Sequence, residues 1–132
     1  MKDASLHVEK YLPAAAATNY SASIDLNVAT AFADDWRKGY LKVKVPALAN
    51  HTDSTKIILL DLQDSADDSS FANTAPLIEC KIAGVASTGS VAVTFKVPIP
   101  PGIRRYIRIF ATVPSGDGDN TGGLIETDWV NE

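Results

Sequence analysis

The segment GYLKVKVP, residues 39–46, alternates apolar and polar side chains without a break. Its apolar members are Leu41, Val43 and Val45, and the side chains between them are Tyr40, Lys42 and Lys44. Successive side chains of a strand point to opposite faces of a sheet, so this spacing predicts a strand with one face in a core and the other in water. The period of two indicates a sheet protein.

Segments of the same kind occur on both sides of residues 39–46. Each is rich in Val, Ile, Thr, Phe and Tyr and is bounded by Gly, Pro, Asn, Asp or Ser, which is typical of strands joined by turns. The further predicted strands are residues 21–28, 55–63, 76–83, 90–97, 105–113 and 122–130. The side chains expected to point inward are Ile24, Leu26, Val28, Ile58, Leu60, Leu62, Val91, Val93, Phe95 and Val97. Because Ile57 and Leu59 occupy the second face of residues 55–63, we expect that strand to be covered on both sides.

Seven strands therefore follow from the alternation, and the remaining segments leave choices open. Residues 5–12, SLHVEKYL, either supply an eighth strand or lie over a neighbour, within an N-terminal arm at residues 1–20 that we expect to be extended. Residues 29–39 form either a short helix ended by Gly39 or a structured loop. The pattern predicts an all-β fold, an antiparallel β-sandwich of the jelly-roll or Greek-key type with about seven to eight strands, as a single domain over residues 1–132.

Composition argues against several classes of partner, although a local basic patch stays open. Twelve Lys and Arg stand against sixteen Asp and Glu, for a formal net charge of −4, whereas proteins that bind a phosphate backbone usually present a strongly basic face. The longest uncharged run has 14 residues, and a membrane-spanning helix needs about 20 mostly apolar residues. We therefore expect a soluble protein with no nucleic-acid partner, no membrane partner and no secretory signal. Cys80 is the one cysteine and is predicted to be a buried small apolar side chain.

The motifs of catalysis are missing from the sequence. His7 and His51 have no nucleophile or carboxylate partner beside them in sequence, and the glycines do not fit a nucleophile elbow, a P-loop or a dinucleotide fingerprint. One cysteine and two distant histidines do not supply the usual ligands of structural zinc. We expect no enzyme activity, no catalytic residues, no cofactor and no metal, although a triad assembled in space stays open.

The nearest approach to a metal motif is DGDNTGGLIETD, which begins at Asp117. Asp119 and Thr121 follow at positions 3 and 5 of an EF-hand-like calcium loop, Gly122 is at position 6 and Asp128 at position 12. The usual bidentate ligand is Glu, however, and the flanking segments are predicted strands. Asp117, Asp119 and Asp128 are thus the candidates for Ca²⁺, and a plain hairpin loop is the interpretation that we favour.

The segment VPIPPGIRRYIRIFATV, residues 97–113, contains three prolines and three arginines. Pro98, Pro100 and Pro101 lack the amide hydrogen for a sheet ladder, so they end the preceding strand, and Gly102 permits a sharp reversal. Alternation places Arg105, Ile107, Ile109 and Ala111 on the expected core face and Arg104, Tyr106, Arg108 and Phe110 on the outer face.

Arginine and aromatic residues are enriched at the energetic centres of protein interfaces, so the outer face of this strand is a predicted contact surface. The alternative is that its arginines pair with acidic residues of the same molecule. The side chains expected to contact a partner are Tyr40, Lys42, Lys44, Ile57, Leu59, Arg104, Tyr106 and Arg108. The acid-rich residues 61–73 are expected to form a solvated connection that Phe71 holds to the core.

Three segments, in order over roughly residues 20–130, resemble the small cement, or decoration, proteins on the heads of tailed bacteriophages. They are LQDSADDSSFA after an apolar strand, VPIPPGIRRYIRIFATV, and a glycine-rich loop leading to GLIETDWV. Within them, RRYIRI resembles the Arg-Tyr-(Leu/Ile)-Arg strand of that family. The polar loop with Asp64 and Phe71 resembles the loop that follows a middle strand in the same family. The family strand corresponds to Arg105, Tyr106, Ile107 and Arg108.

The resemblance implies a jelly-roll subunit with no catalytic residues that forms a homodimer or homotrimer and clamps neighbouring major capsid proteins. It implies a location on the capsid exterior of the virion, and in the host cytoplasm during assembly. The alternative, from another class, is a free β-sandwich module that binds a glycan or another small ligand. Its site would combine Ca²⁺ at the 117–128 loop with an exposed Trp36 or Trp129.

Overall fold

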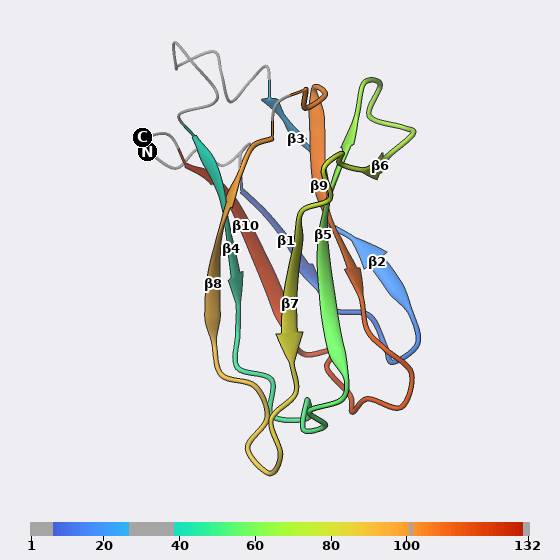
Figure 1. Ribbon diagram of the computed structural model, residues 1–132, viewed down its shortest axis with the longest axis vertical. Helices are drawn as coiled ribbons and strands as arrows, with labels where there is room; N and C mark the ends of the chain where they lie inside the picture. The colour runs from blue at the N-terminus through green and yellow to red at the C-terminus, as the bar shows by residue number, and fades with distance from the viewer. Residues whose placement is uncertain (1–6, 27–38, 101, 131–132) are drawn as a thin grey trace.

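The computed structural model describes residues 7–26, 39–100 and 102–130, so the predicted helix lies outside it except for Gly39. Within these ranges the chain forms ten β-strands in two facing antiparallel sheets (Figure 1). The strands are β1 (His7–Tyr11), β2 (Thr18–Tyr20), β3 (Ile24–Asp25), β4 (Tyr40–Val45), β5 (Ile57–Ser65), β6 (Ala72–Asn73), β7 (Glu79–Ala83), β8 (Val93–Pro98), β9 (Tyr106–Thr112) and β10 (Leu124–Val130). No helix in these ranges is long and apolar enough to cross a membrane.

The strand order is that of a jelly roll. One sheet has the order β1-β10-β4-β8. In the other, β5 pairs with β9, while β2 and β3 pair with successive parts of β9, and β6 and β7 with successive parts of β5. We count β2 and β3 as one interrupted strand, and β6 and β7 as another. The chain then crosses from one sheet to the other between all successive strands except β5 and β6–β7, which lie in the same sheet. This arrangement confirms the predicted antiparallel jelly-roll sandwich.

Residues 7–11 and 18–20 of the expected N-terminal arm lie in the two sheets. β1 pairs with β10 from His7 opposite Asp128 to Tyr11 opposite Leu124, and β2 pairs with β9. The segment SLHVEKYL thus supplies the additional strand that the sequence left open. It forms an edge of the first sheet, because β10 is its one neighbour in the strand order.

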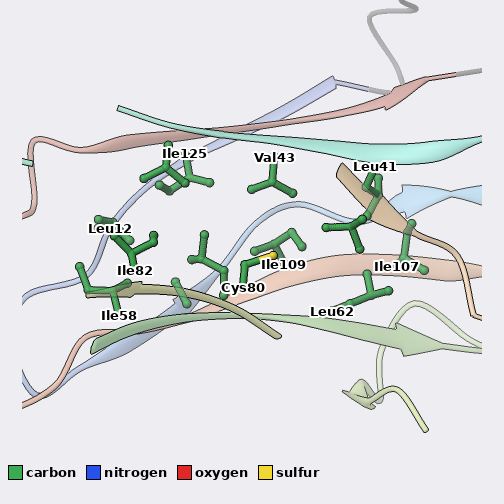
Figure 2. Close-up of a cluster of buried hydrophobic side chains, with 14 of the residues drawn as sticks. Leu12, Leu41, Val43, Ile58, Leu62, Cys80, Ile82, Ile107, Ile109 and Ile125 are labelled. Atoms are coloured by element: carbon green, nitrogen blue, oxygen red, sulfur yellow. The ribbon is translucent and has the colours of Figure 1, made fainter. Parts of the chain in front are cut away.

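The core lies between the sheets and is built from the alternation that the sequence predicts (Figure 2). Leu41 and Val43 of β4 are fully buried, and so are the β5 side chains Ile58 and Leu62. Cys80 is buried among them, and burial raises the pKa of its thiol to about 11. The expected inward positions Ile24, Leu26, Val45, Leu60 and Val97 are also buried, while Val28 lies outside the described residues.

Two side chains expected in the core are exposed, because each precedes the strand to which it was assigned. Val91 is 74% exposed: β8 begins at Val93, and the backbone before it is held in an isolated bridge between Ser90 and Leu48. Arg105 precedes β9, is exposed and forms an ion pair with Asp25. In both segments the alternation predicted the correct period, but the predicted first residue of the strand was wrong.

The acid-rich segment also differs from the prediction, because β5 continues to Ser65. Asp61 and Asp64 are buried in this strand, and the solvated connection is limited to residues that follow it, including the exposed Asp67. The second face of β5 is only partly covered. Leu59 is half-buried, but Ile57 is 41% exposed.

Trp129 closes one end of the core with 1% of its surface exposed, so it cannot serve as the exposed ring of a glycan site. Trp36 lies outside the described residues. The Trp129 ring covers the backbone of Gly39: a Cβ at that position would lie 2.2 Å from Cζ2 of the ring. Glycine is therefore required at residue 39 for space, at the point where the chain enters β4.

Replacing Gly39 by Ala is expected to lower the free energy of unfolding by about 1–3 kcal/mol, the usual cost of overpacking a core. Urea unfolding measures this change. Gly122→Ala is the matched control, because a Cβ there meets no atom within 4 Å and the backbone has no positive φ; its effect should stay within about 0.5 kcal/mol. Equal stability of the two variants would contradict the packing of Trp129 on Gly39.

Candidate functional site

The outer face of the sheet centred on β5 and β9 carries a group of aromatic side chains around Arg108. We call it the arginine-aromatic face and define it by Tyr20, Phe71, Tyr106, Arg108 and Phe110. Strand register brings these residues together: Tyr20 of β2 lies opposite Phe110 of β9, and Phe110 lies opposite Asp61 of β5. Because β9 alternates, Tyr106, Arg108 and Phe110 share this face while Ile107 and Ile109 fill the core.

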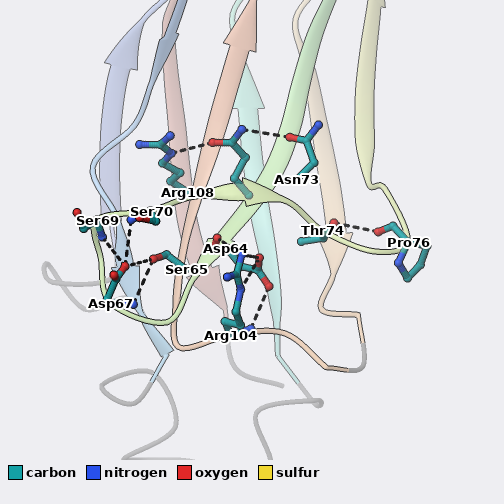
Figure 3. Close-up of polar contacts among 11 residues, drawn as sticks. Asp64, Ser65, Asp67, Ser69, Ser70, Asn73, Thr74, Pro76, Arg104 and Arg108 are labelled. Atoms are coloured by element: carbon teal, nitrogen blue, oxygen red, sulfur yellow. Dashed lines mark hydrogen bonds and ion pairs between the residues drawn. The ribbon is translucent and has the colours of Figure 1, made fainter.

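Arg108 is held between two rings. The centre of its guanidinium lies 3.9 Å from the Tyr20 ring centroid and 4.1 Å from the Phe71 ring centroid. Its Nε donates to Oε1 of Gln63 at 2.9 Å, and Gln63 Nε2 donates to Asn73 Oδ1 at 3.1 Å (Figure 3). Burial lowers the pKa of Arg108, although its reference value is high enough for the group to stay charged. Arg108 is thus a half-buried cation held by two aromatic rings and one side-chain amide.

The loop after β5 positions Phe71 over Arg108. Oδ1 of Asp67 accepts hydrogen bonds from the Ser65 hydroxyl at 2.8 Å and from the backbone N–H groups of Ser69 and Ser70 at 3.0 Å each (Figure 3). These bonds, that of the Ser70 backbone first, lower the pKa of Asp67 to about 2. The closed turn leads directly to Phe71, so the ring is placed by local hydrogen bonds rather than by burial in the core.

The other two arginines of residues 97–113 are engaged within the molecule, as the alternative interpretation proposed. Nη2 of Arg104 donates to Oδ1 of Asp64 at 2.7 Å and to its backbone oxygen at 2.8 Å, and the Arg104 backbone N–H donates to Oδ2 at 3.1 Å. Arg105 forms two hydrogen bonds with Asp25. In the described part of the chain no ion pair joins Arg108 to a carboxylate. Arg108 therefore differs from Arg104 and Arg105, whose charges are each balanced by an aspartate.

Asp61 and Glu79 form a carboxyl pair next to this face. The two residues lie directly opposite each other in the pairing of β5 with β7. Burial, followed by a hydrogen bond to Glu79 and by the charge of that residue, raises the pKa of Asp61 to about 7. The pair therefore holds a proton up to about neutral pH.

The remaining predicted interface residues divide between the two sheets. Tyr40, Lys42 and Lys44 lie on the outer face of the first sheet, where Nζ of Lys96 sits 4.2 Å from the Tyr40 ring centroid. Ile57 and Leu59 lie on the same side of β5 as the arginine-aromatic face. The structure thus brings Ile57, Leu59, Tyr106 and Arg108 to one sheet and separates them from the β4 residues.

The three carboxylates of the candidate calcium loop do not gather around one point. The side chain of Asp117 is only 1% exposed, and its Oδ2 lies 2.8 Å from Nδ1 of the buried His51. Nε2 of His51 lies 2.7 Å from the backbone oxygen of Ile82. Asp119 accepts hydrogen bonds from Thr121, and Asp128 contacts His7 on the outer face of β10. His51 and His7 each have a carboxylate partner that lies far from them in the sequence.

The pKa of Asp61 predicts a pH dependence of stability. Between about pH 4 and 7 the folded chain retains a proton that the unfolded chain has lost, so the free energy of unfolding should fall as the pH rises through this range and level off above it. In Asp61→Asn this fall should shrink, by on the order of 1 kcal/mol between pH 5 and 8. Urea unfolding at the two pH values measures it.

Asp67→Asn serves as the control for this measurement, because the pKa of Asp67 is lowered to about 2 and that carboxyl does not titrate above pH 5. Its free energy of unfolding should change between pH 5 and 8 by as much as that of the parent chain. If Asp61→Asn also retained the full change, the raised pKa of Asp61 would be refuted.

No protein-family model matches this chain, and no curated protein matches it. Among solved structures, one titled Desmodium yellow mottle tymovirus is similar over 93% of this chain and 82% of its own chain, at 10% sequence identity and a TM-score of 0.43. This similarity is too low to assign a function.

Proposed function

We propose that this protein is a virion structural protein that acts as a cement on the outer surface of a phage head, joining neighbouring major capsid proteins. The observation that carries the proposal is the arginine-aromatic face. The resemblance of RRYIRI to the strand of the phage cement proteins supports it, since Tyr106 and Arg108 of that segment point outward on this face.

The composition of the face suits a protein partner. Tyr20, beside Arg108, is 53% exposed, and Ile57, six residues along β5 from Gln63, is 41% exposed, so this face offers both aromatic and aliphatic surface. Tyrosine and arginine are over-represented among the residues that dominate binding energy, and charged residues are depleted at interface centres. The outer face of the other sheet carries lysines and carboxylates instead, and such charges are more typical of an interface rim.

Arg108 is held in place before any partner binds, which favours its use in a contact. The two rings and Gln63 already hold the side chain, so binding would cost less conformational entropy than it does for a free arginine. On a capsid the same contact repeats over many copies, so even modest affinity at each site adds up through avidity. Self-association as a homodimer or homotrimer and a position on the capsid exterior belong to the same proposal.

Arg108→Glu is expected to lower occupancy on capsid shells at least tenfold, because it places a negative charge between Tyr20 and Phe71 and next to Asp68. Lys42→Glu reverses a charge on the opposite sheet and should change occupancy less than twofold. Co-sedimentation with shells measures both, after unfolding curves have established that each variant is folded. Full occupancy by Arg108→Glu would exclude the arginine-aromatic face as the contact.

Heating of phage particles tests the proposed stabilising role of the protein on the capsid. Particles that carry the protein should release their genome or lose their shell at a higher temperature than particles without it, because the cement links neighbouring subunits. Light scattering or a dye that reports released nucleic acid follows the transition. Identical transition temperatures for the two kinds of particle would rule out a stabilising function.

A further inference from the structure

β1 and β10 bring a histidine and three carboxylates together on the outer face of the first sheet. Their register places His7 opposite Asp128 and Glu9 opposite Glu126. His7, Glu9 and Glu126 each offer one ligand atom, and these atoms all lie within 4.8 Å of one another. His7 and Asp128 are 121 residues apart, so only the pairing of these two strands creates the group.

Asp128 orients the histidine. It is 5% exposed, and its Oδ1 contacts Nδ1 of His7. A carboxylate on one ring nitrogen holds the N–H there and turns the other nitrogen toward a ligand, an arrangement found around most metal-bound histidines. The other nitrogen, Nε2, lies 2.9 Å from Oε1 of Glu9. In the neutral imidazole both of these atoms are acceptors, so a cation must be shared between them, either a proton or a metal ion.

Among the described residues, the charges at the register positions around the group favour a divalent ion over a proton. Two glutamates directly opposite each other repel across an antiparallel pair. Lys44 and Lys42 lie opposite Glu126 and Asp128, but on β4, the far side of β10 from Glu9. In the part of the chain that the structure describes, Glu9 on the edge strand has no lysine at its own register. A proton on His7 supplies one positive charge to this side of β10, whereas a metal ion supplies two.

We propose that His7, Glu9 and Glu126 bind a divalent transition-metal ion, with Zn²⁺ the best fit. One imidazole nitrogen and two carboxylate oxygens provide three protein ligands, which leaves a fourth tetrahedral position to water. An imidazole ligand selects against Ca²⁺ and Mg²⁺, which prefer all-oxygen sites. The bound ion fastens the edge strand β1 to β10 and thereby holds the start of the described chain in the sheet.

The group is accessible to ions without opening of the fold. The Glu9 side chain is 46% exposed and that of His7 20% exposed, so a hydrated ion reaches both from solvent. The other histidine, His51, is fully buried, and Cys80 is a buried thiol with a raised pKa. Among the described residues these two are therefore weak competitors for added Zn²⁺.

Calorimetric titration of the full chain with ZnCl₂ at pH 7.5 tests the proposal, with CaCl₂ as the comparison. One Zn²⁺ per chain is expected, with no saturable binding of Ca²⁺. Glu9→Gln and Glu126→Gln should each weaken Zn²⁺ binding at least tenfold, and Asp128→Asn about 10- to 100-fold. Glu79→Gln, which removes a carboxylate from a cross-strand pair on the other sheet, should leave Zn²⁺ affinity unchanged.

Hydrogen exchange supplies a second readout, which reports on β1 itself. Zn²⁺ should slow the exchange of β1 amides selectively, because the ion ties the edge strand to β10, and the effect should vanish in Glu9→Gln. The proposal is overturned if Zn²⁺ fails to saturate at one site, or if folded Glu9→Gln and Glu126→Gln bind it as tightly as the parent chain. Both outcomes are independent of any capsid contact.

Discussion

The register of β5 on β9 is the constraint on which the rest of the structure depends. Leu62 opposite Ile109 and Leu60 opposite Ala111 face the core, while Gln63 opposite Arg108 and Asp61 opposite Phe110 face outward. A slip by one residue would exchange the two faces, exposing the aliphatic side chains and burying Arg108. The hydrophobic core and the arginine-aromatic face are thus two sides of one pairing.

The two sheets present outer faces of different chemistry. One has a half-buried arginine between aromatic rings, with its neighbouring arginines neutralised by Asp64 and Asp25. The other combines lysines on β4 with a histidine and carboxylates on β1 and β10. If the arginine-aromatic face is the contact surface that we propose, the charged face of the other sheet would lie on the solvent side. In this view a metal ion on the charged face would reinforce an edge strand without altering the contact face.

Most of the core could be predicted from the period of two. Leu41, Val43 and Val45 were placed correctly because a strand buried on one face imposes strict alternation. The errors fall at strand ends: Val91 and Arg105 fit the period but lie one or two residues before the ladder begins. The first residues of β8 and β9 are set by where their partner strands β4 and β5 end. A local sequence pattern contains no information on those partner strands. The same reason explains why Asp61 and Asp64 were predicted to lie in a loop. Their acidic side chains suggested a solvated connection, but pairing with β9 extends β5 as far as Ser65.

By itself the sequence determined that the chain is an antiparallel sandwich, which side chains form most of its core and which arginines border the strand at residues 105–113, because all three follow from local alternation and turn chemistry. Only the tertiary structure decided which arginine is held between rings, that Trp129 closes the core over Gly39, and that each histidine meets a carboxylate. Those contacts join residues that are distant in the sequence, as Tyr20 and Phe71 are from Arg108 and His7 from Asp128. Their partners are set by strand order and register, which no local pattern contains.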